Sequence, residues 1–244
     1  YVPQEKPFID KQSVRTIAMS HPTPTRLFFA GTDTDVGKTY TAALVAQMLC
    51  NEGKSVGVYK PVASGCREEN GRLVADDAVQ LWEAAGCPRS LHEVCPQLFE
   101  APLAPPDAAA VEGKTVDEEL LLGGLQPWEE DSDVLIVEGV GGLFSPVADG
   151  ILNVDLAKQL EAILIVVSAN RLGAIHQSLV TCAAASHHGV RPQGIVLCDS
   201  TGASELSAAS NAKQIARYCD VPILATIPFG GAEDHVYAIQ KLLS

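Results

Sequence analysis

The chain has 244 residues, of which 47% are apolar and 19% are charged, and its formal net charge is −13. This apolar share supplies one sizeable core, at most two domains, and excludes a largely disordered chain. The acidic balance argues against a nucleic-acid partner, because such binding needs clustered Lys and Arg. No apolar run is long enough to span a bilayer, so we expect no membrane contact.

Two features of the sequence bear on its compartment. Seven cysteines are scattered along the chain, and none forms a Cys-x-x-Cys pair. This pattern predicts free thiols in a reducing cytoplasm rather than a disulfide framework or a zinc site. Residues 1–25 are polar and proline-containing, and they lack the apolar region of a secretory signal. We expect a flexible N-terminal extension there, with Met19 as the native start and residues 1–18 as an added segment.

Residues 26–244 alternate short apolar runs with helical patterns and predict a single domain. Strands are expected at 26–30, 55–59, 133–137, 162–167, 193–198 and 221–227. Their apolar residues are continuous, which is typical of strands buried on both faces of a parallel sheet. Helices are expected at 39–52, 76–85, 116–125, 153–160, 174–188 and 203–218. The order predicts an α/β fold: a three-layer α/β/α sandwich with a mainly parallel sheet.

Two local signals add detail to this outline. Thr115 and Glu118 have the spacing of a capping box at the start of the third helix. Residues 87–114 contain five prolines and predict a long, stiff loop. Loops of that length inside a compact domain are usually functional or mobile.

The stretch from Gly31 to Thr39, Gly-Thr-Asp-Thr-Asp-Val-Gly-Lys-Thr, lies between the first strand and the first helix. This context predicts a phosphate-binding loop, although five residues rather than four separate its two glycines. Gly37 allows the backbone to approach phosphate, Lys38 supplies a positive charge, and Thr39 supplies a hydroxyl for Mg²⁺. The unpaired N–H groups at a helix start favour an anion at the same place. We therefore expect the chain to bind a nucleoside triphosphate.

Polar or glycine-rich residues follow every predicted strand. Because ligands bind outside the carboxyl ends of parallel strands, these segments should share one edge of the sheet. The first of these segments is the phosphate loop, and the others are residues 60–65, 138–142, 168–173, 198–199 and 228–231.

Three side chains at this edge invite a chemical role. Glu138 ends a buried strand and must be paired or bound to a metal. Mg²⁺ between Glu138 and Asp77 would offset their repulsion, whereas capping or a lysine partner is the structural alternative for Glu138. Lys60 leaves the second strand toward the same edge, and Pro61 stiffens its backbone. The alternative for Lys60 is a lysine that is merely solvated. For Ser64, a functional role and a structural role are equally open.

Four motifs, in order and well spaced, closely resemble the dethiobiotin synthetase family of biotin biosynthesis. They are 31–39, Lys-Pro-Val-Ala-Ser-Gly at 60–65, Val-Glu-Gly-Val-Gly-Gly at 137–142 and Arg-Leu-Gly at 171–173. The resemblance covers about residues 26 to 230. It implies a P-loop NTPase-like homodimer that uses ATP and Mg²⁺ on 7,8-diaminononanoate and CO₂ or bicarbonate. An amine captures CO₂ as a carbamate, the carbamate attacks the γ-phosphate, and the second amine closes the cyclic urea. This is a ligase reaction that forms C–N bonds and releases ADP and phosphate.

The resemblance also implies residue roles. Lys38 and Lys60 would be catalytic, and Thr39, Asp77 and Glu138 would hold Mg²⁺. The substrate would contact Lys60, Ser64, Leu172, Gly173 and Ala174, the last two through N–H groups across the dimer interface. The nucleotide would contact Thr34, Asp35, Val36, Gly37, Lys38, Thr39, Tyr40, Asp77, Glu138, Gly139, Val140, Gly141, Cys198, Asp199, Pro228, Phe229 and Gly230.

Departures and alternatives remain open at this stage. The family often has Glu at the position of Asp35, and usually has Asn at that of Cys198, where an amide reads adenine. A thiol lacks the paired donor and acceptor of an amide, so we expect weaker discrimination among nucleotides. A deviant P-loop switch ATPase, of the partitioning or metallochaperone type, would carry a signature lysine where this chain has Asp33. A cobyrinate-type amide ligase needs a glutaminase domain for which the chain has no room, and a pure nucleotide-binding module leaves Lys60 and Ser64 unexplained.

Overall fold

The fold is built on one six-stranded sheet, seen in a computed structural model that describes residues 23–202 and 206–243. All pairings in this sheet are parallel, and the spatial order is β10-β9-β8-β1-β5-β2. Its strands are β1 (Thr25–Gly31), β2 (Val56–Tyr59), β5 (Val134–Gly142), β8 (Ile163–Ala169), β9 (Gly194–Cys198) and β10 (Ile223–Ile227). The six predicted strands and the parallel α/β class are confirmed.

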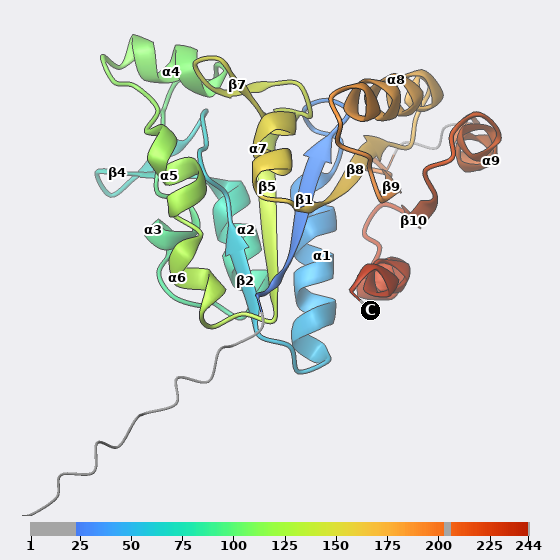
Figure 1. Cartoon of the computed structure of the whole chain (residues 1–244), viewed down its shortest axis with the longest axis horizontal. Coiled ribbons are helices and arrows are strands. Elements are labelled where there is room, and N and C mark those ends of the chain that lie inside the picture. Colours follow the sequence, from blue (N-terminus) through green and yellow to red (C-terminus); the bar gives the residue numbers. More distant parts are fainter. Residues whose placement is uncertain (1–22, 203–205, 244) are drawn as a thin grey trace, which may run out of the picture.

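Helices cover both faces of the sheet (Figure 1). Helices α1 (Lys38–Asn51) and α2 (Asp76–Ala84) pack on each other, and the 3₁₀ helix η1 (Glu233–Leu242) lies beside α1. Helices α8 (Ala174–His187) and α9 (Ala208–Tyr218) pack on each other and connect β8, β9 and β10. Right-handed crossovers in opposite directions from the central β1 and β8 place α1 and α8 on opposite faces.

The remaining elements are short. They are the hairpins β3 (Arg67–Glu69) with β4 (Arg72–Val74) and β6 (Pro146–Ala148) with β7 (Ile151–Leu152), and the helices α3 (Leu91–Val94), α4 (Pro105–Val111), α5 (Glu118–Gly123), α6 (Gln126–Glu129) and α7 (Asn153–Gln159). No helix in the described ranges combines the length and apolar character needed to cross a membrane.

Several boundaries differ from the sequence-based expectation. Strand β5 continues to Gly142, because Gly142 still pairs with Gly31 of β1. The capping box predicted at Thr115 is wrong: α5 begins at Glu118, and the Asp117 carboxylate caps it by accepting from Glu119 and Leu120 N–H groups. Residue 25 belongs to β1 rather than to an extension, and the predictions for 1–22 and 203–205 lie outside the described residues.

Strand register places the key side chains level with one another. Tyr59 of β2 is paired with Val137 of β5, so the next residues, Lys60 and Glu138, lie side by side at the carboxyl edge. Strand β1 runs on the other side of β5, with Phe29 opposite Glu138, and leads directly into the phosphate loop. Three segments distant in the sequence therefore converge on one edge.

Candidate active site

The phosphate loop turns sharply into α1 at Gly37. Gly37 is the residue before the helix, and its φ of +88° is in the left-handed region that favours glycine. A Cβ atom there would also come within 2.5 Å of the Cys198 sulfur, so both conformation and space require glycine. The Thr41 N–H donates to the Gly37 carbonyl at 2.9 Å, which starts the helix. The loop thereby presents the N-terminal N–H groups of a 14-residue helix to the edge of the sheet.

A buried charge cluster lies directly beside this helix start. The Lys60 ammonium donates to the Glu138 carboxylate at 2.7 Å and lies 3.1 Å from an Asp77 oxygen. Thr39 Oγ1 donates to the same Glu138 oxygen at 3.0 Å. The side chains of Lys60 and Glu138 are 2% and 0% exposed, whereas that of Asp77 is 53% exposed. Lys60 therefore bridges Asp77 and Glu138. From the sequence, a metal ion is expected to offset the repulsion between these two carboxylates.

Neighbouring charges set the protonation of the cluster. Burial alone would lower the pKa of Lys60, but the attraction of Glu138 and Asp77 outweighs it and raises that pKa. Burial tends to raise the pKa of Asp77, and the Lys60 charge with its hydrogen bond lowers it overall. Burial, together with the Lys60 charge, lowers the pKa of Lys38 despite the opposing pull of Glu138. The pKa values of the two lysines are therefore shifted in opposite directions, that of Lys60 upward and that of Lys38 downward.

The donor set suits a magnesium ion. Glu138 Oε2 is buried and has no hydrogen-bond partner among the described residues, so one oxygen is left for a further ligand. Asp77 offers a second carboxylate, and Thr39 a hydroxyl. The described residues hold no group of three or more His, Cys, Asp or Glu side chains that could hold a metal by themselves. Two carboxylates completed by phosphate and water oxygens are the usual magnesium environment.

A cavity of 610 Å³ opens over the cluster. Its lining residues come from the phosphate loop, the edge of the sheet and two further loops: Thr34, Asp35, Lys38, Lys60, Ser64, Gly65, Asp77, Pro102, Leu103, Ala104, Pro105, Val140, Gly141, Ser145 and Pro146. The structure therefore brings together Thr34, Asp35, Lys38, Lys60 and Asp77 of the predicted site, with Ser64, Val140 and Gly141. Thr39 and Glu138 join them through their hydrogen bond.

The proline-rich segment 87–114 forms one wall of this cavity. It runs beside residues 60–66, with hydrogen bonds from the Lys60 N–H to the Val94 carbonyl at 2.8 Å and from the Ala63 N–H to the Gln97 carbonyl at 2.9 Å. Ser64 Oγ donates to the Leu103 carbonyl at 2.6 Å. The segment carries α3 and α4 and is hydrogen-bonded to the second predicted motif.

A second group of predicted residues lies outside the cavity lining. Cys198 is 1% exposed and packs behind Gly37, and burial raises the pKa of its thiol to about 11. Asp199 closes a turn by accepting from the Thr201 and Gly202 N–H groups. Pro228, Phe229 and Gly230 form an exposed loop after β10. The Tyr40 hydroxyl donates to the Gly231 carbonyl, and Ser200 Oγ donates to the Asp35 carbonyl. These two hydrogen bonds connect the segments after β9 and β10 to the phosphate loop and the start of α1. Val36 is buried beneath the loop.

Leu172, Gly173 and Ala174 form a third group, at the turn from β8 into α8. None of them lines the cavity over Lys60. Leu172 is 83% exposed, Gly173 adopts a φ of +98°, and Ala174 is buried with its N–H donating to the Arg171 carbonyl at 3.1 Å. Within one chain this group is therefore separate from the charge cluster.

Sequence reasoning missed one buried residue that shapes the site. Asn153 is fully buried, and its amide donates to the carbonyls of Val140 and Gly142 at 2.7 and 2.8 Å. Its oxygen accepts from the Val140 N–H at 3.1 Å. A Cβ at Gly139 would lie 2.5 Å from that same oxygen, so Gly139 permits the contact. Only the tertiary structure identifies Asn153, whereas the proline content of 102–105 was a usable signal for the cavity wall.

Comparisons with known proteins identify relatives of this chain. A family model described as an AAA domain matches residues 25–232. The ATP-dependent dethiobiotin synthetase of Rhodopirellula baltica is 42% identical over 211 residues, covering 82% of each chain. The synthetases of Idiomarina loihiensis and Aromatoleum aromaticum are 34% and 33% identical, covering 83% and 90% of this chain and 91% and 97% of theirs.

Solved structures are similar in fold alone. The signal recognition particle receptor FtsY of Elizabethkingia anophelis, in complex with GDP, aligns with a TM-score of 0.52 at 16% identity. The alignment covers 90% of this chain and 61% of the receptor chain. The chloroplast FtsY of Physcomitrella patens gives a TM-score of 0.51 at 18% identity, over 91% and 66% of the two chains. The extent and identity of the curated matches show that the chain belongs to the dethiobiotin synthetase family.

Proposed function

We propose that the chain closes a cyclic urea on 7,8-diaminononanoate with CO₂, using ATP. The observation that carries this proposal is the meeting of the phosphate loop with Lys60, Asp77 and Glu138 at one cavity. Lys38 and Lys60 supply positive charge within the reach of a bound phosphate, and the start of α1 supplies N–H donors. Phosphoryl transfer depends mainly on such positioning and electrostatics, and this arrangement provides both.

The chemistry balances without a protein nucleophile. A substrate amine adds to CO₂ and loses a proton, which gives a carbamate. A carbamate oxygen attacks the γ-phosphorus and ADP leaves, so that a carbamic–phosphoric anhydride forms. The second amine then attacks the carbonyl carbon, the ring closes, and phosphate departs. Lys60 and Lys38 stabilise the negative charge on the carbamate and the transferring phosphoryl group, and the proline-rich wall restricts water.

Magnesium is part of the proposal. Thr39, Asp77 and Glu138 would hold it, since one Glu138 oxygen lacks a partner among the residues of the described structure. The ion would neutralise phosphate oxygens. Lys60, which bridges the carboxylates in the ligand-free chain, can then direct its charge to the reacting groups.

The nucleotide base would lie on the surface formed by Asp199, Phe229 and Gly230, which is fastened to the phosphate loop. Cys198 packs behind Gly37 and offers no amide toward this surface. We therefore expect less than a tenfold difference in kcat/KM between ATP and CTP. A strong preference for ATP, measured with both nucleotides, would contradict this assignment.

A homodimer completes the proposed site. Leu172 and Val180, at the start and in the middle of the α8 region, are 83% and 52% exposed, which suits a subunit interface. Gly173 and Ala174 of a second copy would then approach the substrate carboxylate. The seven free thiols suit a reducing cytoplasm.

The test is ADP release measured with each substrate omitted in turn. Release should require both the diamine and bicarbonate, and mass spectrometry should show the cyclic urea. ADP release that is indifferent to the diamine would overturn the proposal and favour a switch ATPase. Light scattering at catalytic concentration would test the dimer separately.

A further inference from the structure

A second cavity, of 740 Å³, lies outside the proposed active site. The hairpin β3–β4, helix α2 and helix α3 surround it, and it shares no lining residue with the cavity over Lys60. Its volume is in the range of small-molecule sites. Leu73, Leu91 and Leu98 give it an apolar wall, and Arg72 and His92 supply polar groups.

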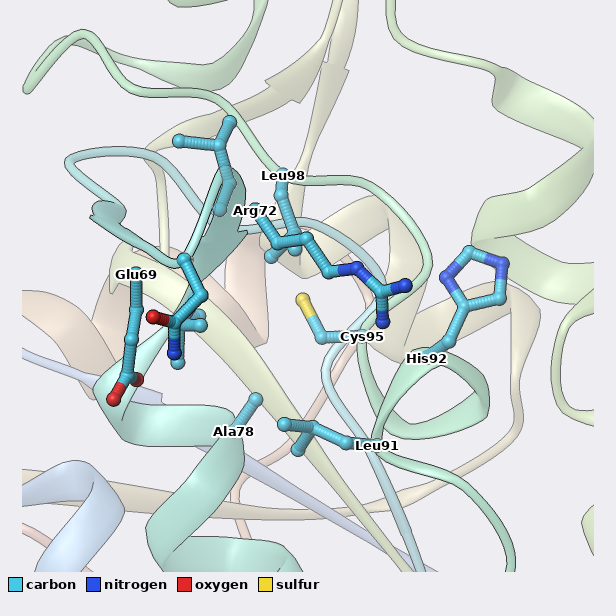
Figure 2. A pocket seen from close by; sticks show the side chains of 11 residues that line it. Glu69, Arg72, Ala78, Leu91, His92, Cys95 and Leu98 are labelled. Carbon is cyan, nitrogen blue, oxygen red and sulfur yellow. The ribbon is translucent and has the colours of Figure 1, made fainter.

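Arg72 is an exposed residue of the lining and supplies its positive charge. Figure 2 shows its guanidinium extending between His92 and Cys95, with Leu91 and Leu98 nearby. Within residues 23–202 and 206–243, no ion pair joins Arg72 to a carboxylate. Glu69 is opposite Arg72 in the hairpin register, yet its carboxylate is paired with Arg67 at 2.7 Å. Figure 2 shows Glu69 at the far side of the cavity from His92.

We propose that this second cavity binds a small amphipathic carboxylate. Arginine holds a carboxylate through two parallel N–H donors, and His92 can add a third. The leucine wall would cover a medium-length alkyl chain, whose burial away from water favours binding. A polyphosphate is disfavoured, because a single arginine in a lining that also contains Glu69 cannot offset several negative charges.

The same cavity is lined by residues close in the sequence to two segments of the proposed active site. Ala75 and Ala78 line it and flank Asp77 on α2. Cys95 also lines it, is 2% exposed, and follows Val94, whose carbonyl accepts the Lys60 N–H at 2.8 Å. An occupant would therefore bear on the two segments that position Lys60 and Asp77. We infer that the ligand changes turnover, and this second part rests on the proposed function.

Binding is tested by isothermal titration of the full chain with octanoate, in saturating MgADP so that the nucleotide site is filled. Octanoate should bind, while octylamine and acetate should bind at least tenfold more weakly. Arg72→Leu should weaken octanoate binding at least tenfold, which corresponds to about 1.4 kcal/mol, because it removes the charge-assisted hydrogen bonds to the carboxylate. The matched control is Arg217→Leu, which removes one arginine charge from α9 and should leave the affinity unchanged. Thermal unfolding of both variants verifies their folding.

Three outcomes would overturn the binding proposal: equal affinity in Arg72→Leu, equal binding of octylamine, or absence of octanoate binding in MgADP.

A turnover measurement tests the second part of the inference. Octanoate should change diamine-dependent ADP release at least twofold in the wild type and leave Arg72→Leu unaffected; an unchanged wild-type rate would refute the link to Lys60. If the chain shows no diamine-dependent release at all, the proposed function fails while the titration still decides the binding.

Discussion

Replacing Lys60 by methionine tests the charge cluster most directly. Methionine retains much of the side-chain volume and removes the ammonium that contacts Glu138 at 2.7 Å. At an effective dielectric near 20, that contact corresponds to a gross attraction of about 6 kcal/mol. Desolvation of the two buried ions offsets part of it. Since Glu138 would remain buried without its partner, we expect the free energy of unfolding to fall by about 3–5 kcal/mol.

Asp77 contributes little to this value. Its side chain is 53% exposed, so water screens its interaction with Lys60, and we assign it at most about 1 kcal/mol. Urea unfolding followed by circular dichroism measures the loss. Lys54→Met is the matched control, because Lys54 is exposed near the end of α1 and should change stability by less than about 0.5 kcal/mol.

A double variant separates the pairing from packing. In Lys60→Met/Glu138→Gln the uncompensated carboxylate is gone, so we expect the double variant to recover at least half of the stability that the single variant loses. A single variant within about 1 kcal/mol of the wild type would refute the buried pair. A double variant as unstable as the single one would assign the loss to side-chain packing. All these variants should lose diamine-dependent ADP release, except Lys54→Met.

Four further predictions follow from particular contacts. Gly37→Ala should lower the free energy of unfolding in urea more than Gly53→Ala. Both glycines have positive φ, but only a Cβ at Gly37 would clash with the Cys198 sulfur, so equal losses would contradict the steric argument. The pKa of Asp77 is lowered in the folded state, so its stabilising effect is full above its ordinary pKa of 3.8 and is lost as pH falls through the lower, folded value. The difference in unfolding free energy between the wild type and Asp77→Asn should therefore begin to shrink below an ordinary pKa of 3.8 and vanish at still lower pH; a constant difference would count against the Lys60 contact. Asn153→Ala should lower the free energy of unfolding by about 1–3 kcal/mol and reduce turnover, because it removes the amide that donates to the Val140 and Gly142 carbonyls and accepts from the Val140 N–H; stability unchanged from the wild type would contradict the role assigned to its amide. ATP affinity, measured by titration, should fall at least tenfold when EDTA removes Mg²⁺, and this dependence should shrink in Glu138→Gln; a metal-independent affinity would exclude Glu138 as a ligand.

The sheet was predictable because its strands carry their own signal. Short, mostly apolar runs predicted all six positions; two of them, Val56 to Tyr59 of β2 and Val134 to Val137 of β5, are buried throughout. Topology then placed Lys60 and Glu138 at one edge, since each directly follows a run of strand residues. The end of β5 was less predictable, because residues 139–142 have the composition of a turn, yet Gly142 still pairs with Gly31 of β1 beyond an irregularity in the register.

Long-range partners were not predictable in the same way. The segment 87–114 has proline spacing typical of a loop, and its backbone bonds to residues 60–66 depend on contacts that no local pattern encodes. Likewise Asn153 is the first residue of an ordinary helical pattern, and only its burial against Val140 identifies it. The same limit applies to α5, the third helix predicted from the sequence, which is capped by Asp117 rather than by Thr115.

The charge balance of the site connects structure to function. Lys38 and Lys60 offset Asp77 and Glu138 in the ligand-free chain, so the formal charges of these four side chains cancel. A triphosphate brings several negative charges next to two carboxylates, which repel it until a cation covers them. Because Lys60 cannot fully serve the carboxylates and the phosphate at once, a divalent ion held by Asp77 and Glu138, as we propose, would make its charge available. On this proposal the buried lysine and the Glu138 oxygen without a hydrogen-bond partner among the described residues belong to one arrangement, and the metal and the nucleotide would bind together.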